Sequence, residues 1–595
     1  MTYRVKYKSM MLLMPLLAAC SGNDGGTTAA LPQLDTAVAT QGVAQPAIAV
    51  KPLTDFDLWA KRLMADEISP VIAGAGDLTQ TWTGADGKLA NVVVQVPRTA
   101  GKPTVSVAPP AQGSDATPIL QTALSQLRKA GGGILKISLG EYHFKTGNQA
   151  DQAGLAQFLV SKVSDVDIQG AGAKFIFDTN CDGILVEASQ RVRIQGISME
   201  DSRDLSGNGR MHKVDGVMRL ELDKPLPANV TINWVQPMNE GATRSWPQTP
   251  MRTILTPSDA QPVRIDDRTF TAPTFKNIAD GQYVSVKFTW YGKRALYVLD
   301  TSRAVNEDII FDGVHIGSIG GMGMVVRTRG RGIALVNSTI SASAGKPYST
   351  NYDGVHVIAA AGDVLLRGNS FAHTGDDQIN VRSIIHQVSN VTNNNVTLSN
   401  SARLIRVGDE IGFFTAAGEY LGKRMIKSAP PLGNSDTITF GLAPGEPILE
   451  AAYARDINIT PRRFAVVNNT MTDSSGRGML IQVPNGLIQG NVIRGIPHTA
   501  IRMLTSFDPW LEGAGAINVR VTGNTINSGG GALGLGFVTG IITALGEITS
   551  TKLPANMQNG PIKIDNNTFT APRAACIAVY NTQGVVQENN VCGGK

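Results

Sequence analysis

The sequence predicts an all-β protein, a parallel β-helix with a short N-terminal capping helix and two small inserted β modules. Short segments in which apolar and polar residues alternate recur along most of its 595 residues and close on Gly or Asn. Alternation with period two indicates a strand with one buried face, and Gly or Asn tolerates the positive φ of a corner. Segments repeated every twenty-odd residues indicate a solenoid whose coils pack only on their neighbours.

The spacing of these segments fixes the period of the solenoid. Asn469 and Asn491 are 22 residues apart, Asn567 and Asn590 are 23 apart, and the longer gaps contain loops. The clearest segments are 166–170, 192–196, 309–313, 333–337, 364–369, 465–469, 486–491, 519–524, 562–567 and 585–590.

The N-terminus predicts a lipoprotein signal peptide. Arg4, Lys6 and Lys8 precede an apolar run that ends in LAAC at 17–20, which resembles the bacterial lipobox, whose cysteine is lipidated. An ordinary secretory signal that happens to end in Cys is the alternative. Ser21 resembles the sorting pattern of outer-membrane lipoproteins. We therefore expect a bacterial cell-envelope protein, anchored to the outer membrane through a lipid on Cys20 and facing the periplasm or the surface.

Composition shifts and breaks in the repeat divide the chain into eight segments. They are the signal peptide 1–19, a flexible Ala/Thr/Gln-rich tether 20–50, a segment 51–110 leading into the helix, N-terminal coils with their cap 111–212, an inserted β module 213–300, the catalytic coils 301–385, a second inserted β module 386–460 and C-terminal coils 461–595.

An amphipathic helix is predicted at the start of the coils. Apolar residues recur at helical spacing from Ile119 to Leu127, and Asp115 or Thr117 is the expected N-cap. Three glycines at 131–133 end the helix. This start resembles that of right-handed β-helix proteins such as pectin-active enzymes, in which a helix would cover the open end of the core. A generic helix-to-strand junction is the alternative.

Charge and cysteine content exclude several partners. The formal charge of +5 falls by three, to +2, when the signal leaves with its three basic residues, so nothing argues for nucleic acid or for a basic groove. No Cys/His cluster has metal-ligand spacing, and we expect no cofactor. Cys576 and Cys592 are sixteen residues apart and could form a disulfide or remain buried thiols.

Three aspartates, one apparent repeat apart, carry the functional prediction. Asp353 lies in NYDG, and Asp376 and Asp377 are adjacent in TGDD. Like charges within a few Å raise one another's pKa, so that one carboxyl stays protonated while another is ionised. Acid/base hydrolysis of a glycosidic bond needs such a combination. We predict that these three aspartates are the catalytic carboxylates.

Aligning the inward residues of successive coils places other polar side chains beside the aspartates. One column holds Asp353, Asp377, Arg477 and Thr499, flanked by Tyr352, Asp376, Gly476 and His498, and a second holds His356, Asn380, Leu480 and Arg502. Strands about 4.8 Å apart bring Asp353 and Asp377 into contact, with Arg477 next to them. The expected result is a polar cleft that a sugar ring could occupy. A solvated surface, with Arg477 as a salt-bridge partner, is the alternative.

These motifs resemble glycoside hydrolase family 110, the inverting exo-α-1,3-galactosidases on a right-handed β-helix. The resemblance spans about residues 290–530. It rests on DGVH at 353–356, DDQINVR at 376–382, VGDEIGFF at 407–414, RGMLIQVPNGLIQGNVI at 477–493 and DPWLEG at 508–513. Gln378 and Arg382 stand where that family often has Ala and His, and Gly-Ala follows Glu512 instead of Ser-Gly, which bears on the sugar. The more distant likeness to polygalacturonases lacks their GHG and RIK elements.

The resemblance implies roles for the polar residues. Asp353, Asp376 and Asp377 would be acid and base, with Asp376 the first choice for the acid, and the outer pair would supply the 6.5–9.5 Å of an inverting site. Trp510 would stack on a sugar face and Glu512 would accept hydroxyl hydrogen bonds. The full set of expected substrate-binding residues is His356, Asn380, Arg382, Arg477, His498, Arg502, Trp510 and Glu512.

The sequence thus predicts a lipid-anchored glycoside hydrolase that removes terminal galactose from a glycan or galactan. An endo-hydrolase or a lyase of an acidic polysaccharide on the same scaffold remains open, since Arg477 beside Asp377 could neutralise a substrate carboxylate. A non-catalytic glycan-binding surface protein is the third possibility. The oligomeric state, the natural polymer and the exact linkage stay open.

Overall fold

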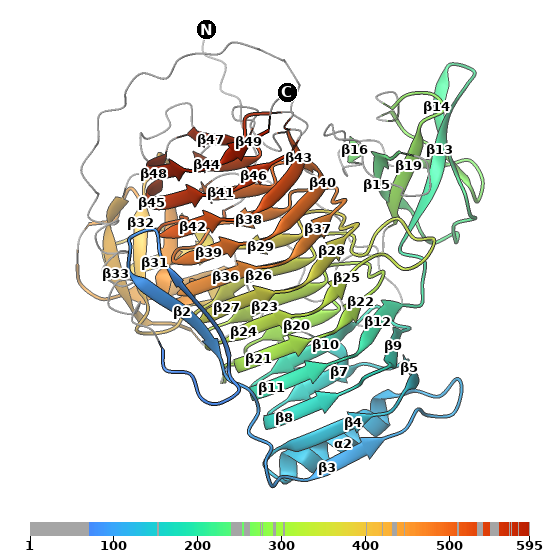
Figure 1. The fold of residues 1–595 in the computed structure, drawn as a ribbon, viewed down its shortest axis with the longest axis horizontal. Helices are drawn as coiled ribbons and strands as arrows, with labels where there is room; N and C mark the ends of the chain where they lie inside the picture. Colours follow the sequence, from blue (N-terminus) through green and yellow to red (C-terminus); the bar gives the residue numbers. More distant parts are fainter. Residues whose placement is uncertain are drawn as a thin grey trace.

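The structure is a computed structural model whose main body is a solenoid built from three long β-sheets (Figure 1). It describes residues 71–593 except 151–153, 240–252, 255–261, 274, 276–277, 289–292, 302–303, 400–401, 419, 431–436, 446, 508–510, 514, 532–539, 548–557, 571, 573 and 581. The predicted signal peptide, Cys20 and tether lie outside the described residues, and so does Trp510.

Each of the three sheets gains one strand per coil, and the chain visits them in the order sheet 1, sheet 2, sheet 3. Sheet 1 runs through β3 (Thr104–Val107), β4 (Gly133–Ile137), β8 (Ser164–Gln169), β11 (Gln190–Gln195), β21 (Glu307–Asp312), β24 (Ile333–Val336), β27 (Asp363–Arg367), β36 (Arg463–Val467), β39 (Gly486–Gln489), β42 (Val519–Thr522), β45 (Gln558–Asp565) and β48 (Thr582–Glu588).

Sheet 2 runs through β5 (Gly140–Phe144), β9 (Ala173–Phe177), β12 (Ser198–Asp201), β22 (His315–Ile316), β25 (Thr339–Ile340), β28 (Ser370–Ala372), β37 (Thr470–Thr472), β40 (Val492–His498), β43 (Thr525–Gly531), β46 (Thr568–Phe569) and β49 (Val591–Cys592). Sheet 3 runs through β6 (Asn148–Gln149), β7 (Leu155–Ser161), β10 (Asp182–Glu187), β20 (Leu296–Leu299), β23 (Met324–Thr328), β26 (Val355–Ala360), β29 (Ile379–Val381), β38 (Met479–Ile481), β41 (Ile501–Ser506), β44 (Ile542–Glu547) and β47 (Ile577–Tyr580). All strand pairs in the three sheets are parallel except β6 with β7, so the predicted parallel β-helix architecture is confirmed.

The inward-facing side chains of the three sheets form one apolar core along the coils. Val355, Ile379, Met479 and Ile501 occupy equivalent inward positions on four successive strands of sheet 3, and all are fully buried. This is the period-two pattern of the sequence, in which every second side chain of a strand enters the core.

A ladder of asparagines fills the corner between sheets 1 and 2. Each side-chain Nδ2 donates to the Oδ1 of the next asparagine along the stack, which also accepts the previous residue's backbone N–H. The ladder runs through Asn369, Asn469, Asn491, Asn524, Asn567 and Asn590. The recurring Asn of the repeat therefore satisfies buried backbone groups where the chain turns.

Replacing Asn491 by Ala should destabilise the coils strongly. Asn491 is fully buried, and its Oδ1 accepts both the backbone N–H and the Nδ2 of Asn469. An unsatisfied buried polar group costs about 1–3 kcal/mol, so a loss of about 2–4 kcal/mol in unfolding free energy is expected in a urea titration. Asn590→Ala, at the half-buried end of the ladder, is the control and should cost much less. Equal losses at both positions would contradict this account.

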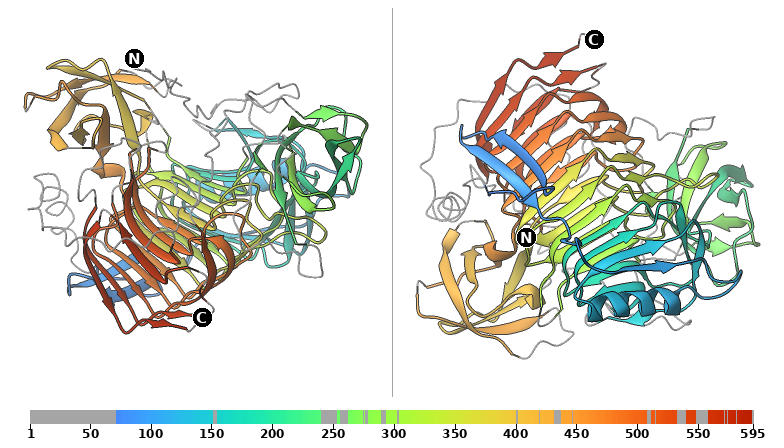
Figure 2. Two further views of the ribbon diagram at one scale, coloured as in Figure 1. Left: turned by 90° about the horizontal axis from the view of Figure 1, so that it is seen from above. Right: turned by 60° about the horizontal axis from the view of Figure 1, so that its bottom comes forward.

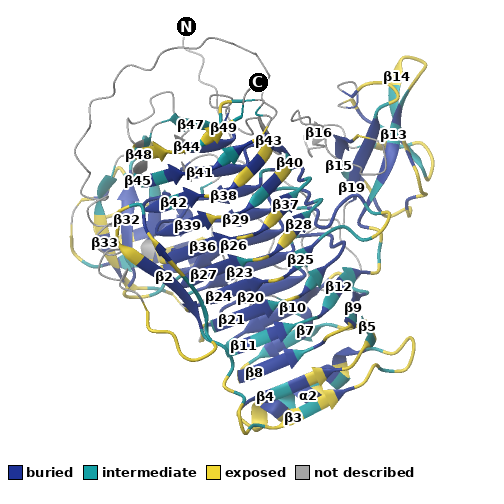
Figure 3. Cartoon of the chain, viewed as in Figure 1, coloured by how far each residue is buried: buried dark blue, intermediate teal, exposed yellow. Residues whose placement is uncertain are grey.

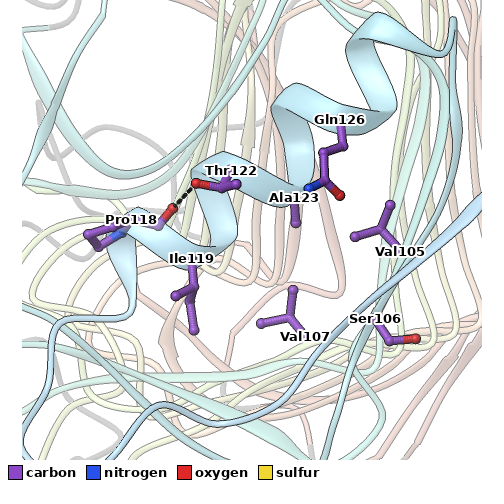
Figure 4. A pocket seen from close by; sticks show the side chains of 8 residues that line it. All are labelled: Val105, Ser106, Val107, Pro118, Ile119, Thr122, Ala123 and Gln126. Carbon is purple, nitrogen blue, oxygen red and sulfur yellow. Dashed lines mark hydrogen bonds between the residues drawn. The ribbon is translucent and has the colours of Figure 1, made fainter.

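Helix α2 (Thr117–Lys129) packs on the first coils through Leu120, Leu124 and Leu127. Its N-cap is Ala116, which makes no side-chain cap hydrogen bond, instead of the predicted Asp115 or Thr117. Asp115 Oδ1 does accept the backbone N–H of Thr117, at 3.0 Å, from one residue further out. A shallow hollow of about 300 Å³ lies between α2 and β3, lined mainly by aliphatic side chains (Figure 4).

A hairpin covers the outer face of sheet 1. Strands β1 (Leu78–Thr83) and β2 (Leu89–Val94) pair antiparallel, and the right view of Figure 2 shows them lying across the solenoid. Trp82, Val92 and Val94 pack against outward-facing apolar residues of sheet 1. From the sequence, this segment was predicted only to lead into the helix, because a hairpin of six-residue strands has no repeat that identifies its partner.

Two antiparallel β modules stand beside the solenoid, each with its own apolar core (Figures 1 and 2). The first is a sheet of seven strands, which we call the antiparallel module to distinguish it from the barrel. Its strands lie in the spatial order β16 (Thr253–Ile254), β15 (Ile232–Pro237), β19 (Tyr283–Phe288), β13 (Ser206–Val214), β14 (Val217–Leu222), β18 (Thr269–Thr271) and β17 (Val263–Arg264). The second is a closed barrel of β30 (Ile385–Ser389), β31 (Asn395–Ser399), β34 (Ile438–Leu442), β33 (Tyr420–Ser428), β32 (Glu410–Phe414) and β35 (Tyr453–Asp456), with short 3₁₀ turns at Ala402–Leu404 and Ile457–Ile459.

The module boundaries differ from the sequence-based ones by a few residues. The antiparallel module begins at Ser206 instead of 213, because the Gly-rich start of β13 has no apolar alternation, and β20 already belongs to sheet 3 instead of to the 213–300 segment. Near the C-terminus, Cys576 and Cys592 form a disulfide with Cα atoms 6.3 Å apart. Within the described part of the chain, no helix has the length and apolar character needed to cross a membrane.

Candidate active site

The three aspartates lie at the corner where strands of sheet 3 begin. Asp353 precedes β26, Asp376 and Asp377 precede β29, and Arg477 precedes β38. The strand register pairs His356 with Asn380, Asn380 with Leu480 and Leu480 with Arg502. The alignment of coils derived from the sequence is therefore confirmed, and it places Asp353, Asp377 and Arg477 in one column.

The three carboxylates form a tight cluster. One oxygen of each of Asp353, Asp376 and Asp377 lies within 4.8 Å of the others. Asp353 and Asp377 are 6% and 3% exposed, while Asp376 is half-buried and is the most accessible of the three. This spacing joins one oxygen of each residue, so the 6.5–9.5 Å expected between the acid and base groups of an inverting site stays a prediction.

Arg477 balances the charge of Asp377. Its Nη1 lies 3.0 Å from Asp377 Oδ2, and its backbone N–H donates to Asp377 Oδ1 at 2.7 Å. The guanidinium is only 13% exposed. Because charge-assisted hydrogen bonds of this kind hold a carboxylate in one orientation, Arg477 fixes Asp377 within the cluster.

Asp353 is held from two sides. Its Oδ1 accepts the backbone N–H of Asp377 at 3.2 Å, and its Oδ2 lies 2.9 Å from His356 Nδ1, outside hydrogen-bond geometry. Arg382 Nε donates to His356 Nε2 at 2.9 Å, so the proton of a neutral His356 must be on Nδ1, the nitrogen that faces Asp353. Both ring nitrogens of His356 therefore face protein groups, Arg382 on one side and Asp353 on the other.

The same network continues to Glu512. Arg382 Nε also lies 3.1 Å from Glu512 Oε1, and Gln482 Nε2 donates to Glu512 Oε2 at 2.7 Å. The sequence analysis missed Gln482. The signal was available, because Gln482 directly follows Ile481 just as Arg382 directly follows Val381, its partner in the strand register.

Burial and like charge shift the proton affinities of this network. The pKa of Asp353 is raised well above its ordinary value, first by burial and then by the negative charges of Asp376, Asp377 and Glu512. Burial, together with the cations Arg382 and Arg327, lowers the pKa of His356 well below its ordinary value. The cluster therefore keeps a proton that isolated aspartates would lose, and this proton belongs to the coupled group.

The other predicted contact residues are more enclosed than expected. Asn380 and Arg502 are 4% and 5% exposed, and His498 is fully buried, so the structure does not present His498 to a sugar. Strands β26 and β29 are buried along their whole length (Figure 3). Outside the strands, Ile358 of β26 belongs to an apolar cluster with Ile384 and with Leu404 and Ile459 of the two 3₁₀ turns.

The arrangement can hold both a proton and a water. A water that bridges two carboxylates through hydrogen bonds of about 2.8 Å each places the two carboxylate oxygens roughly 4.5 Å apart. This distance fits carboxylates whose oxygens lie within 4.8 Å of one another. A carboxyl that keeps its proton can act as a general acid, while an ionised one activates the water. The same oxygens are close enough to hold a metal ion. His356 could not join them as a ligand, because its facing nitrogen carries the proton.

The hollow beside α2 is remote from this chemistry. Strands β4, β8, β11, β21 and β24 separate β3 from β27 in sheet 1, which corresponds to roughly 30 Å at the usual strand spacing. Its lining contains no ionisable side chain. The aspartate corner is therefore the candidate active site.

Comparison with known proteins finds relatives by sequence but no matching family profile. No protein-family profile matches the chain. It is 22% identical over 465 residues to "Alpha-1,3-galactosidase A" of Shewanella woodyi, covering 70% of this chain and 74% of the relative. It is also 22% identical over 607 residues to "Alpha-1,3-galactosidase B" of Akkermansia muciniphila, covering 93% and 73%.

Among solved structures, the catalytic unit of a GH87 α-1,3-glucanase from Streptomyces thermodiastaticus has a TM-score of 0.32 at 14% identity, covering 85% of this chain and 71% of that one. An endo-xylogalacturonan hydrolase from Aspergillus tubingensis has a TM-score of 0.35 at 10% identity, covering 82% and 96%. Over most of its length, the chain is similar in sequence to α-1,3-galactosidases, as the motifs around Asp353 and Asp376 indicated.

Proposed function

We propose that the chain is a glycoside hydrolase, and more narrowly an inverting exo-α-1,3-galactosidase that removes terminal galactose from a glycan or galactan. The observation that carries the proposal is the gathering of Asp353, Asp376 and Asp377 at one corner, where burial and like charge raise the pKa of Asp353 and an arginine balances Asp377. The names of the two relatives supply the sugar and the linkage.

In the proposed reaction, the three carboxylates divide the acid and base roles. Asp376 is the most accessible of them and delivers the proton of the cluster to the leaving glycosidic oxygen. Asp377, held by Arg477, accepts a proton from the attacking water. After the products leave, the proton that Asp377 took from water passes through Asp353 to Asp376, so that the cluster regains the proton it gave to the leaving oxygen. The C1–O bond breaks as the water oxygen bonds to C1 from the opposite face, so the product is β-galactose.

The scaffold part of the proposal concerns what surrounds the site. We infer that the coils wind to the right, as parallel crossovers almost always do, and that α2 caps the N-terminal end of the core through Leu120, Leu124 and Leu127. We treat the antiparallel module and the barrel as insertions in the solenoid. The module comes before β20 and the barrel comes after β29, both strands of sheet 3, so that the aspartate loops lie between the two insertions in the chain.

The decisive experiment is hydrolysis of defined galactosides. We expect release of galactose from an α-1,3-linked digalactoside and from p-nitrophenyl α-galactoside, and none from the β-galactoside. Proton NMR of the first product should show the β anomer. The α anomer would contradict the inverting step, and an unsaturated, ultraviolet-absorbing product from an acidic polysaccharide would identify a lyase. Binding of glycans without cleavage of any would identify a glycan-binding protein.

We also propose that Cys20 carries a lipid that anchors the protein to the outer membrane, because the motif at 17–20 resembles a lipobox. Wild-type protein expressed in a Gram-negative host should pellet with membranes and carry an acyl chain on its N-terminal peptide by mass spectrometry. Cys20→Ser should leave an unprocessed or soluble form. Wild-type protein that stays in the soluble fraction without an acyl chain would contradict the anchor.

A further inference from the structure

A buried lysine of the antiparallel module reaches the loop that carries the aspartates. Lys287, on β19, is 1% exposed, and its Nζ donates to the backbone carbonyl of Gly375 at 2.8 Å. Gly375 directly precedes Asp376. The ammonium is therefore bonded to a carbonyl of the predicted catalytic loop, although Lys287 comes from a different module.

Aromatic rings surround the same ammonium. Nζ lies 4.0 Å from the centre of the Trp234 ring, 5.2 Å from that of Tyr348 and 5.1 Å from that of Tyr352. Trp234 is the register partner of Lys287 in the antiparallel module, whereas both tyrosines belong to the solenoid. Tyr352 directly precedes Asp353. The lysine thus touches the chain immediately before Asp353 and immediately before Asp376.

The two loop segments held by Lys287 are also stacked on each other. The backbone N–H of Gly375 donates to the carbonyl of Thr350 at 2.8 Å, and Ser475 Oγ donates to the Gly375 carbonyl. A side chain at Gly375 would meet the carbonyl of Asn351 at 2.5 Å. The loop therefore has little room, and a displaced Gly375 would carry Asp376 and Asp377 with it.

Stability alone does not explain a charge at this position. A buried ammonium loses its hydration, and this desolvation penalty is large unless hydrogen bonds and aromatic ring faces compensate for it. A methionine of similar length could fill the same space between Trp234 and Tyr348 without that penalty. The lysine provides what methionine cannot, a donor that fixes the position of one particular carbonyl.

We propose that Lys287 is a positioning residue for the reaction, and that the antiparallel module is an integral part of the active site through this contact. The inference rests on the proposed function, since it assumes that the aspartate cluster performs the chemistry. The module supplies the cation and one ring face, and the solenoid supplies the carbonyl and two ring faces. Docking of the module thereby sets the distance between Asp353 and Asp376.

The test compares Lys287→Met with Lys287→Arg and with a matched control. Lys346→Met also removes a lysine that links the base of the module to the solenoid, through the carbonyls of Asp201 and Arg203, but it does not touch the aspartate loop. Four quantities are measured for each variant: kcat and KM on p-nitrophenyl α-galactoside, the Tm, and amide hydrogen exchange of peptides covering residues 373–379.

Lys287→Met should lower kcat by about 10- to 100-fold, since an ångström-scale misplacement of a catalytic group has effects of that size. KM should change by less than about threefold, because the loss concerns positioning of the carboxylates. Amides of the aspartate loop should exchange faster, Lys287→Arg should recover most of kcat, and Lys346→Met should keep wild-type kcat and loop exchange. Wild-type kcat and exchange in Lys287→Met would overturn the proposal.

Two outcomes of this experiment are interpreted separately. If the wild-type protein cleaves no galactoside, the proposed function fails, and the exchange of residues 373–379 in Lys287→Met alone decides whether Lys287 holds the loop. If Lys287→Met does not fold, Trp234→Phe keeps the lysine and weakens one ring face. That variant should show faster loop exchange and a lower kcat, and wild-type behaviour in both would contradict the inference.

Discussion

Replacing Asp353, Asp376 or Asp377 singly by Asn should lower kcat by about 10²- to 10⁴-fold, the usual effect of losing a positioned acid or base. Each carboxylate lies within 4.8 Å of the other two, so none can act alone. Double substitutions should therefore cost far less than the product of the single effects. Initial rates on the cleaved galactoside, with the folded fraction measured in parallel, check this prediction. Near-wild-type turnover in all three variants would place the chemistry elsewhere.

Stability should separate the three variants, because their burial differs. Asp376→Asn changes a half-buried residue and should leave the Tm nearly unchanged, whereas Asp377→Asn removes the carboxylate that pairs with Arg477 and should lower it. The sequence alone suggested that folding would survive all three changes. Two of the aspartates turn out to be buried, so Asp376→Asn is the cleanest test of chemistry.

The pH dependence follows from the raised pKa of Asp353. Folding raises this pKa above the ordinary 3.8, so the stability linked to Asp353 is complete below that value and is lost as the pH rises through the folded-state pKa. Asp353→Asn has no such proton to lose, and its Tm relative to wild type should increase with pH. Activity of the wild type should be bell-shaped, with an alkaline limb that reports loss of the proton shared by the cluster.

Arg477→Ala is the second large effect, and it should reduce both activity and stability. The substitution leaves Asp377, which is 3% exposed, without the guanidinium 3.0 Å away. Removing one partner of a buried ion pair costs about 3–5 kcal/mol. Because Asp377 would lose the guanidinium that fixes its orientation, we expect kcat/KM to fall together with the Tm. The sequence pattern placed Arg477 on the outward face of its strand and so predicted an unchanged Tm. Because Asp377 is buried and Arg477 largely so in the structure, we now expect the Tm to fall.

A second arginine–aspartate pair provides the control for Arg477. Arg520 Nη2 lies 2.7 Å from Asp565 Oδ2 at a more exposed position, 26% for the arginine side chain, and on sheet 1, whereas the aspartates precede strands of sheet 3. Arg520→Ala should cost about 1 kcal/mol or less and leave kcat/KM unchanged. If Arg477→Ala behaved in the same way, Arg477 and Asp377 would form no more than a surface ion pair.

The coils and their register could be derived from the sequence because both depend on local periodicity. Side chains of a strand alternate between two faces, so a shift of one residue would turn Val355 or Ile379 out of the apolar core and turn their polar neighbours into it. The recurring asparagines mark the corners, since their side chains bond to the next coil. Together these signals determined that Asp353, Asp377 and Arg477 share one column, and they placed His356 beside Asn380.

Only the tertiary structure decided how enclosed that column is and what holds it. The burial of His498 and Arg502, the short distances among the carboxylates and the contact of Lys287 with Gly375 all depend on segments far apart in the chain. Lys287 precedes Gly375 by 88 residues and belongs to a module without the solenoid repeat. Periodicity reports which face a residue occupies, whereas the packing of a module against that face depends on long-range contacts that leave no regular pattern in the sequence.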